Sequence, residues 1–232
     1  MDNLTEGFYF KGTNNFGVLL CHGFTGAPGE MKELGVALNK EGYTVKCIEY
    51  RGHGSDKENF LNTNVYEWYN DLQSALEELR NDVKFLYVMG LSMGGAFSVK
   101  VAEDYNIQGL VTMNAPLVGM PLKEILDSRK EDLTDDVYQL ELNSLTKYSK
   151  FITEVGQTIN LNKITAPLLI VQGMIDQDRY KISSHMLTTY SNSKILKRID
   201  LPKSGHLVTT EDERYDLFKA IIMFLKEIEK KS

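Results

Sequence analysis

Residues 85–95 read Phe-Leu-Tyr-Val-Met-Gly-Leu-Ser-Met-Gly-Gly, an apolar run that ends in a serine between glycines. The run is typical of a buried strand, and residues 96–105 have the pattern of a helix. A turn that joins a strand directly to a helix strains the backbone of its central residue, which only small neighbours such as Gly90 and Gly94 allow. Such a turn lifts the serine oxygen clear of the sheet, so Ser92 is the predicted nucleophile. The alternative for the pattern alone is a glycine-rich packing turn.

A serine hydroxyl needs a base within hydrogen-bond reach, and two histidines follow Ser92 in the chain. His185 lies in a predicted helix over residues 181–190, on the flank of the sheet. His206 lies in a loop directly after a predicted strand over residues 194–200, so it emerges at the carboxyl edge of the sheet, as Ser92 does. His206 is therefore the predicted base, and an ordinary loop histidine is the alternative.

The third group should be a carboxylate that orients the histidine, placed in a loop after another strand. Residues 167–173 form a buried-strand run, and Asp176 and Asp178 follow it. We predict that Asp176 is the acid. Asp178 stays open as the alternative, because a one-residue error in the end of the strand would exchange their directions. Asp200 lies too far inside its predicted strand.

Acyl transfer also needs backbone N–H groups aimed at the oxygen that becomes negative. The amide of Met93 directly follows the nucleophile at the positive end of the predicted helix. The second donor should come from the loop after an earlier strand, and Phe16-Gly-Val-Leu-Leu-Cys-His-Gly-Phe-Thr-Gly is such a strand and loop. We assign this donor to the amide of Phe24. His22 precedes the serine in the chain, so we interpret it as a structural residue of the loop.

The candidate residues belong to short motifs that follow one another along the chain. The motifs are His22-Gly23-Phe24, Arg51-Gly52-His53-Gly54, Gly90-Leu91-Ser92-Met93-Gly94, Asp176 and Ser204-Gly205-His206. Further motifs are Glu41-Gly-Tyr-Thr, Trp68 before Asp71, and Val111-Thr-Met-Asn-Ala-Pro. From about Gly17 to the C-terminal helix, the chain resembles the α/β-hydrolase superfamily, and within it the small bacterial carboxylesterases and monoacylglycerol lipases. The resemblance implies an eight-stranded, mostly parallel sheet with helices on both faces. It also maps nucleophile, acid and base onto Ser92, Asp176 and His206, and the oxyanion donors onto Phe24 and Met93.

The chain departs from the family pattern directly after the acid. The family often has an apolar residue and a proline there, whereas Gln177-Asp178-Arg179-Tyr180 follow in this chain. This difference keeps Asp178 open as the acid and indicates a locally different wall of the substrate site.

Strand and helix patterns alternate along the chain, which predicts βαβ units and a parallel sheet. The predicted strands are residues 16–21, 43–49, 83–89 and 107–113, and the predicted helices are residues 29–41, 65–80 and 93–105. Thr210 followed by Glu213 has the spacing of a capping box, so the last helix should begin at Thr210. Residues 117–166 interrupt the alternation, and we interpret them as a small helical cap inserted in a single domain, residues 1–232. Extra core packing is the alternative.

Composition restricts the class of protein. The chain has 232 residues and a net charge of −6, and no lysine-arginine cluster is interleaved with aromatic residues, so a nucleic-acid role is disfavoured. The sequence shows neither a signal-peptide pattern nor a run of about 20 apolar residues, so we expect a cytoplasmic protein without stable membrane insertion. Cys21 and Cys47 should be buried free thiols. The histidines and cysteines show no metal-ligand spacing, and no cofactor is expected.

The predicted reaction is hydrolysis of carboxylic esters, either short- to medium-chain acyl esters or monoacylglycerols, by a monomer or homodimer. Phe24, Met93, Met120 and Met174 could line an adaptable apolar acyl site, with core packing as the alternative for the methionines. Arg51 and His53 belong to a glycine-rich turn, where a structural role is favoured over substrate contact. A thioesterase or acyltransferase would share the triad, as would a carbon–carbon hydrolase or a small peptidase. A non-catalytic binding protein is disfavoured because all three triad positions are present.

Overall fold

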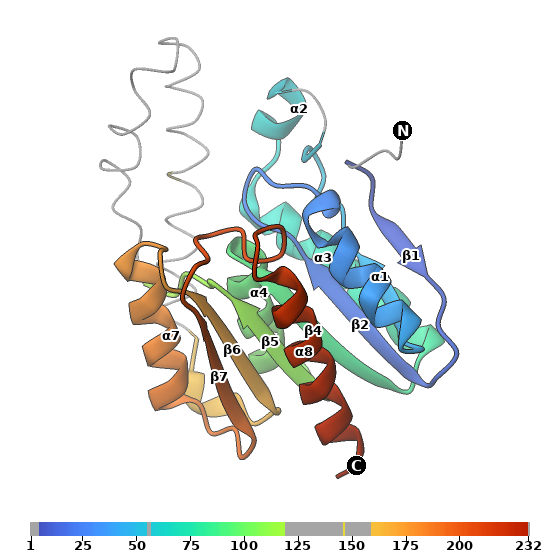
Figure 1. Ribbon diagram of the computed structural model, residues 1–232. Coiled ribbons are helices and arrows are strands. Elements are labelled where there is room, and N and C mark those ends of the chain that lie inside the picture. Colours follow the sequence, from blue (N-terminus) through green and yellow to red (C-terminus); the bar gives the residue numbers. More distant parts are fainter. Residues whose placement is uncertain (1–4, 55–56, 119–145, 147–158, 232) are drawn as a thin grey trace.

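The computed structural model describes residues 5–54, 57–118, 146 and 159–231. Within them, seven strands form one sheet in the order β1-β3-β2-β4-β5-β6-β7, and only β1 runs antiparallel to its neighbour (Figure 1). The strands are β1 (Phe8–Phe10), β2 (Phe16–Cys21), β3 (Thr44–Cys47), β4 (Phe85–Leu91), β5 (Gly109–Met113), β6 (Leu168–Gly173) and β7 (Leu196–Leu201). This is the mostly parallel sheet of an α/β-hydrolase. The eighth strand that the resemblance implied is not among the described residues.

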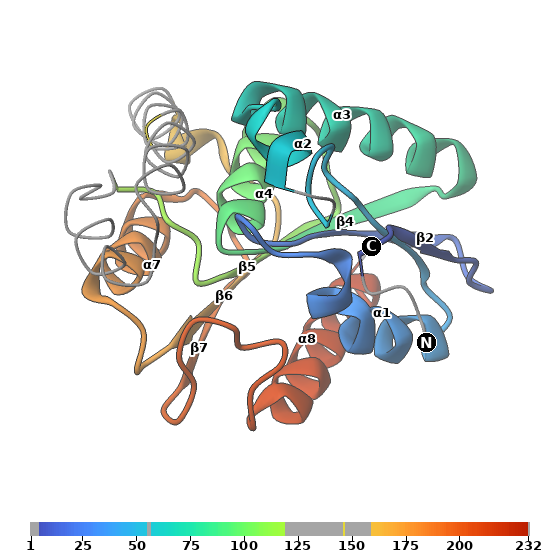
Figure 2. The ribbon, with the colours of Figure 1, turned by 90° about the horizontal axis from the view of Figure 1, so that it is seen from above.

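Helices cover both faces of the sheet, as Figure 2 shows from above. Helices α1 (Lys32–Lys40) and α8 (Arg214–Glu229) pack on one face, and α3 (Val65–Asp82), α4 (Met93–Asp104) and α7 (Asp178–Tyr190) belong to the other. Two short 3₁₀ helices (Pro28–Met31 and Leu161–Lys163) and helix α2 (Lys57–Leu61) complete the described elements.

The central strands are buried on both faces, because helices lie above and below them. Leu19 and Cys21 of β2 contribute to the core under α3 and α4, while Val18 and Leu20 contribute to the core under α1 and α8. This alternation follows from the two-residue period of a strand. The continuous apolar runs that predicted these strands are therefore the consequence of burial on both faces. Cys21, like Cys47 on β3, is a buried free thiol, as expected.

The last helix begins at Arg214, so the capping box predicted at Thr210 is wrong. The carboxylate of Glu213 instead accepts hydrogen bonds from the Lys203 amide at 2.8 Å and the Ser204 hydroxyl at 2.7 Å. Because this carboxylate is committed to the loop before the helix, it is not available to cap the helix. The spacing of Thr210 and Glu213 is that of a capping box, but the contacts of Glu213 with Lys203 and Ser204 prevent it from acting as one.

The segment predicted to be a cap, residues 117–166, lies mostly outside the described residues. Leu117 at its start is buried, and its amide donates to the Ser183 hydroxyl of α7 at 2.8 Å. At the other end, Ile159 and Ile164 are buried in the core on the α3 and α4 face. None of the helices in the described part of the chain has the length and apolar character needed to cross a membrane.

Candidate active site

Ser92 lies on the turn between β4 and α4, and its backbone has φ 54° and ψ −122°. A non-glycine residue with positive φ is strained, so close packing must hold it there. A Cβ atom at Gly90 would lie 2.0 Å from the carbonyl oxygen of Gly94, and one at Gly94 would lie 2.2 Å from the carbonyl oxygen of Cys21. The two glycines therefore allow the helix to start directly against the sheet, with Ser92 at the junction.

Ser92, His206 and Asp176 lie in hydrogen-bond contact, although they are far apart in the sequence. Nε2 of His206 is 2.9 Å from the Ser92 hydroxyl oxygen, and Nδ1 is 2.7 Å from Oδ2 of Asp176. The three residues follow β4, β7 and β6, which are parallel strands whose carboxyl ends meet at one edge of the sheet (Figure 1). A carboxylate only accepts hydrogen bonds, so Nδ1 carries the proton and Nε2 is free to accept the proton of the serine.

The structure separates the two candidate carboxylates. Asp176 is buried, and its other oxygen accepts the amide of Gln177 at 2.7 Å. The side chain of Asp178 is 90% exposed and forms an ion pair with Lys181 at 3.2 Å. The carboxylate that faces the histidine is thus that of Asp176, and Asp178 belongs to the exposed face of α7.

A buried asparagine at the end of β5 fixes the histidine loop. The side-chain amide of Asn114 donates to the carbonyl oxygens of Gly205 and His206, both at 2.9 Å, and its oxygen accepts the amide of Gly173 at 2.8 Å. Asn114 has φ 47° and is fully buried. Its three hydrogen bonds connect the ends of β5 and β6 with the backbone of the histidine. The sequence placed this residue only in a motif of the resemblance and gave no sign of its role.

Two glutamates hold the same loop from the other side. The carboxylate of Glu211 accepts the amides of Gly205 at 2.5 Å and Leu207 at 3.0 Å, one on each side of His206. Together with the contacts of Glu213 to Lys203 and Ser204, these bonds hold the chain on both sides of the histidine. Such supporting contacts restrict the positions that the imidazole can take.

The loop after β2 passes directly beside the serine. A Cβ atom at Gly23 would lie 3.9 Å from the hydroxyl oxygen of Ser92. The Phe24 ring packs against Phe60 and Trp68, with ring centroids 5.6 and 5.9 Å away, and this packing anchors the loop. The amide of Phe24 thus belongs to a segment that borders the nucleophile, as does the amide of Met93 at the start of α4.

The four residues predicted to bind substrate have different surroundings. Met93 is fully buried in the core, so only its backbone borders the serine. Met174 is 39% exposed after β6, Phe24 is partly buried in the aromatic cluster, and Met120 lies outside the described residues. The side chain of Met93 thus packs in the core beside Ala96 and Phe97 of the same helix.

Arg51 and His53 are held in the turn after β3. The guanidinium of Arg51 binds the carboxylate of Asp71 through two nitrogens, at 2.9 and 2.5 Å. His53 is buried against Trp68, with ring centroids 4.6 Å apart. These contacts hold both side chains within the turn.

His53 and His22 form a buried imidazole pair beneath the loop that carries Phe24. Their ring centroids are 5.3 Å apart, and Nδ1 of His22 is 3.0 Å from the carbonyl oxygen of Gly23. Nε2 of His22 and both ring nitrogens of His53 are buried without a hydrogen-bond partner. Burial, with a smaller contribution from His53, lowers the pKa of His22 to about 3, and burial lowers the pKa of His53 to about 4. Both rings are therefore neutral at pH 7.

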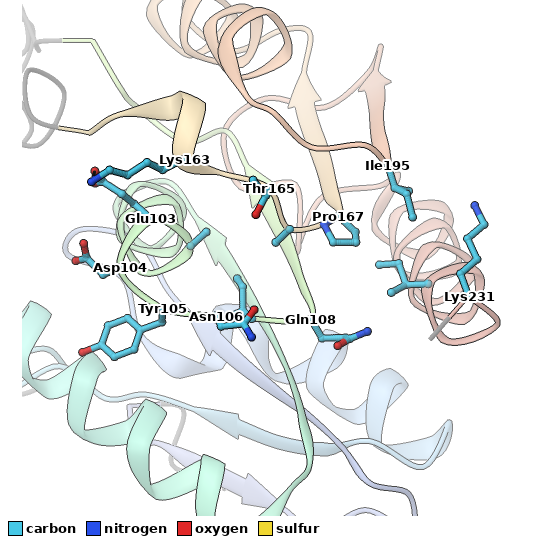
Figure 3. Close-up of a pocket in the computed structure, with 14 residues that line it drawn as sticks. Glu103, Asp104, Tyr105, Asn106, Gln108, Lys163, Thr165, Pro167, Ile195 and Lys231 are labelled. Carbon is cyan, nitrogen blue, oxygen red and sulfur yellow. Dashed lines mark ion pairs between the residues drawn. The ribbon is translucent and has the colours of Figure 1, made fainter.

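A separate hollow lies at the opposite edge of the sheet, where β5, β6 and β7 begin (Figure 3). It has a volume of about 530 Å³, and its lining includes Glu103, Tyr105, Lys163 and Lys231. Its walls come from the amino ends of these strands, at the edge of the sheet opposite to that where Ser92 lies. In the described part of the chain, no group of three or more His, Cys, Asp or Glu side chains could hold a metal ion.

The sheet, the strained serine turn and the hydrogen-bonded Ser-His-Asp group define the chain as an α/β-hydrolase. Residues 14–147, more than half of the chain, match the family model Hydrolase_4, described as serine aminopeptidase, S33. The chain belongs to this family, and it is related to a bacterial carboxylesterase and a bacterial monoacylglycerol lipase.

Three similar proteins illustrate this relationship. A carboxylesterase of Bacillus subtilis (strain 168) is 27% identical over 96% of each chain. A thermostable monoacylglycerol lipase of Bacillus sp. (strain H-257) is 33% identical over 71% of this chain and 72% of that protein. A solved structure from work on LipS and LipT, two metagenome-derived lipolytic enzymes, is 22% identical, with a TM-score of 0.83 over 97% of this chain and 98% of that chain.

Replacing Asn114 tests how much the histidine loop depends on it. We expect Asn114→Ala to lower the free energy of unfolding by about 3 kcal/mol, because it leaves buried carbonyl and amide groups without partners. Urea denaturation of the purified variant measures this loss. Thr112→Val on the same strand is the matched control: the Thr112 hydroxyl is buried without a partner, so this change should be neutral or stabilising. Equal losses in the two variants would contradict the assigned role of Asn114.

The buried imidazoles predict how stability depends on pH. Histidines in an unfolded chain have a pKa of about 6.5. The unfolded chain therefore takes up protons that the folded chain excludes as the pH falls from about 6.5 towards the folded-state pKa values of about 4 and 3. Stability is full above this window and decreases within it, by about 1.4 kcal/mol per pH unit for each histidine.

We expect His53→Phe to remove about half of this decrease between pH 6 and pH 4.5, measured by urea denaturation at each pH. Phenylalanine keeps the aromatic packing against Trp68 but cannot be protonated. His185→Gln on the exposed face of α7 is the control and should retain the slope of the parent protein. A slope that His53→Phe leaves unchanged would show that His53 does not cause the acid sensitivity.

Proposed function

We propose that this protein hydrolyses carboxylic esters through an acyl-enzyme, with Ser92 as nucleophile, His206 as general base and acid, and Asp176 as the group that orients the histidine. The observation that carries the proposal is the continuous hydrogen-bonded chain from the Ser92 hydroxyl through His206 to Asp176. The carboxylesterase and the monoacylglycerol lipase among its relatives favour esters as the substrate class.

In the first step, the Ser92 oxygen attacks the ester carbonyl while Nε2 of His206 takes the hydroxyl proton. The carbonyl oxygen becomes negative and accepts hydrogen bonds from the amides of Phe24 and Met93. Asp176 stabilises the imidazolium. When the tetrahedral intermediate collapses, the bond to the leaving alcohol breaks, and the histidine gives its proton to the alcohol oxygen.

In the second step, water attacks the acyl-serine with His206 again as base. The bond between the acyl group and Ser92 breaks, the serine oxygen regains its proton, and the carboxylic acid leaves. The strained turn contributes to both steps, because it presents the serine oxygen and the Met93 amide to the same carbonyl group without further rearrangement.

Hydrolysis of p-nitrophenyl esters with acyl chains of two to sixteen carbons tests the proposed function. We expect the wild-type protein to hydrolyse at least some of these esters. Ser92→Ala should reduce kcat at least about 10³-fold, because alanine has no hydroxyl group to attack the ester carbonyl. His206→Ala should have a similar effect, and the double variant should lose little more, since the two residues act as a unit. Additive losses would contradict the shared mechanism. If thioesters were hydrolysed faster than oxygen esters, the preferred leaving group would be a thiol, and the protein would be a thioesterase.

The two neighbouring aspartates supply a matched pair for the same assay. Asp176→Asn should reduce kcat by about 10³- to 10⁴-fold, because an amide disturbs the tautomer of the histidine. Asp178→Asn changes the same chemical group two residues away at an exposed position and should leave kcat within about twofold. Comparable losses in both variants would remove Asp176 from its proposed role.

A further inference from the structure

The first turn of α7 contributes a cation and a phenol next to the candidate catalytic residues. Both residues belong to the segment Gln177-Asp178-Arg179-Tyr180, where the chain departs from the family pattern of an apolar residue and a proline after the acid. Nη2 of Arg179 donates a hydrogen bond to the hydroxyl oxygen of Tyr180 at 3.1 Å. The guanidinium carbon also lies 4.7 Å from the centroid of the tyrosine ring. The two side chains thus form one unit.

Tyr180 connects this unit with the imidazole of His206. Its ring centroid is 4.5 Å from that of His206, at an interplanar angle of 45°. Burial raises the pKa of Tyr180, the charge and the hydrogen bond of Arg179 lower it, and the charge of Asp176 raises it. Tyr180 thus contacts the guanidinium through its hydroxyl and, through its ring, the imidazole that is hydrogen-bonded to Ser92.

Arg179 differs from the other arginines in the described part of the chain. Arg51, Arg80, Arg198 and Arg214 each form an ion pair with a carboxylate. Arg179 has no such partner among the described residues, and its Nε is buried without a hydrogen-bond acceptor. A partly buried guanidinium without a counter-ion is costly unless a ligand supplies the negative charge.

The direction of the hydrogen bonds indicates what kind of ligand fits. A guanidinium has no acceptor, so Tyr180 accepts from Arg179, and the proton of its own hydroxyl remains available to an oxygen of a ligand. The unit offers a fixed positive charge and several donors but no negative group of its own. This is the donor set that carboxylates prefer.

We propose that Arg179 and Tyr180 bind a carboxylate group of the substrate, so that the preferred esters carry a free carboxylate a few bonds from the ester carbonyl. This inference rests on the proposed ester hydrolysis and narrows its substrate class. An ester with the carboxylate on its acyl part would release a dicarboxylate, and one with the carboxylate on its alcohol part would release a hydroxy acid. Arg179 supplies the charge, and Tyr180 places the carboxylate relative to the serine and the histidine.

Two matched substrate pairs test the proposal with the full-length protein. Monomethyl glutarate is compared with methyl pentanoate, which places the carboxylate on the acyl part, and 4-acetoxybutyrate with butyl acetate, which places it on the alcohol part. Hydrolysis is followed by NMR. In at least one pair, we expect kcat/KM to be about tenfold higher or more for the anionic ester.

Arg179→Gln should reduce this anionic-to-neutral ratio by about 10- to 100-fold, as expected for the loss of a charge-assisted hydrogen bond. The ratio is the readout because a general loss of hydrolysis would lower kcat/KM for both members of a pair equally and leave the ratio unchanged. Arg179→Lys retains the charge without the planar fork and should restore part of the ratio. Arg80→Gln, on the distant helix α3, is the control and should leave the ratio unchanged. A wild-type protein that prefers the neutral ester in both pairs, or a ratio that Arg179→Gln does not alter, would overturn the proposal.

A binding measurement separates this inference from the proposed function. Glutarate should bind the Ser92→Ala protein in calorimetry at least about tenfold more tightly than it binds the Ser92→Ala, Arg179→Gln double variant. If the wild type hydrolyses none of the esters while glutarate still binds in an Arg179-dependent way, the hydrolase proposal fails and the carboxylate site stands. If neutral esters are hydrolysed and glutarate does not bind, the carboxylate site fails and the hydrolase proposal stands.

Discussion

The strained backbone of Ser92 is the constraint on which the rest of the site depends. A positive φ at a serine persists only where the surroundings leave no other conformation, and here β4 is a central strand with α4 packed directly against it. The close approach between Gly90 and Gly94 brings the first turn of that helix onto the sheet. The same approach presents the Met93 amide and the serine oxygen together. The position of the candidate nucleophile is thus a property of the core rather than of a surface loop.

The other members of the group reach the serine because parallel strands end at one edge, but strand ends alone would not fix a side chain. The loop of His206 leaves the last strand, and it has contacts with Asn114 on one side and Glu211 on the other. Asn114 itself lies at the end of the strand next to β4. The serine turn and the histidine loop are therefore tied to adjacent strands, and a displacement of one would disturb the other.

The sequence predicted the elements that local pattern determines. Continuous apolar runs predicted the central strands within a few residues, because burial on both faces leaves no other pattern. It did not predict β1, whose three residues form an edge strand, or the start of α8, where Glu213 binds the preceding loop instead of capping the helix.

Residues that act through long-range contacts were also missed. Asn114 carried no local signal for its hydrogen bonds to a loop about 90 residues away. For Arg179 and Tyr180, the sequence indicated only a departure from a family pattern. The contact with the histidine ring became visible once α7 was placed against the sheet.

The polar groups around Ser92 fall into two kinds with different energetic consequences. The hydrogen-bonded group and its supports satisfy one another, so they specify one geometry at little cost in stability. Nε2 of His22, both ring nitrogens of His53 and Nε of Arg179 are buried without partners and cost stability in the free protein. For the two histidines, packing offsets this cost, because their rings belong to the aromatic cluster that anchors the Phe24 loop beside the serine. For Arg179 no partner within the described protein provides a comparable gain, and a carboxylate of the substrate would supply it. Binding of that carboxylate would then offset the free-energy cost of burying Arg179. A neutral ester would not offset it, so the unpaired guanidinium would favour anionic over neutral esters.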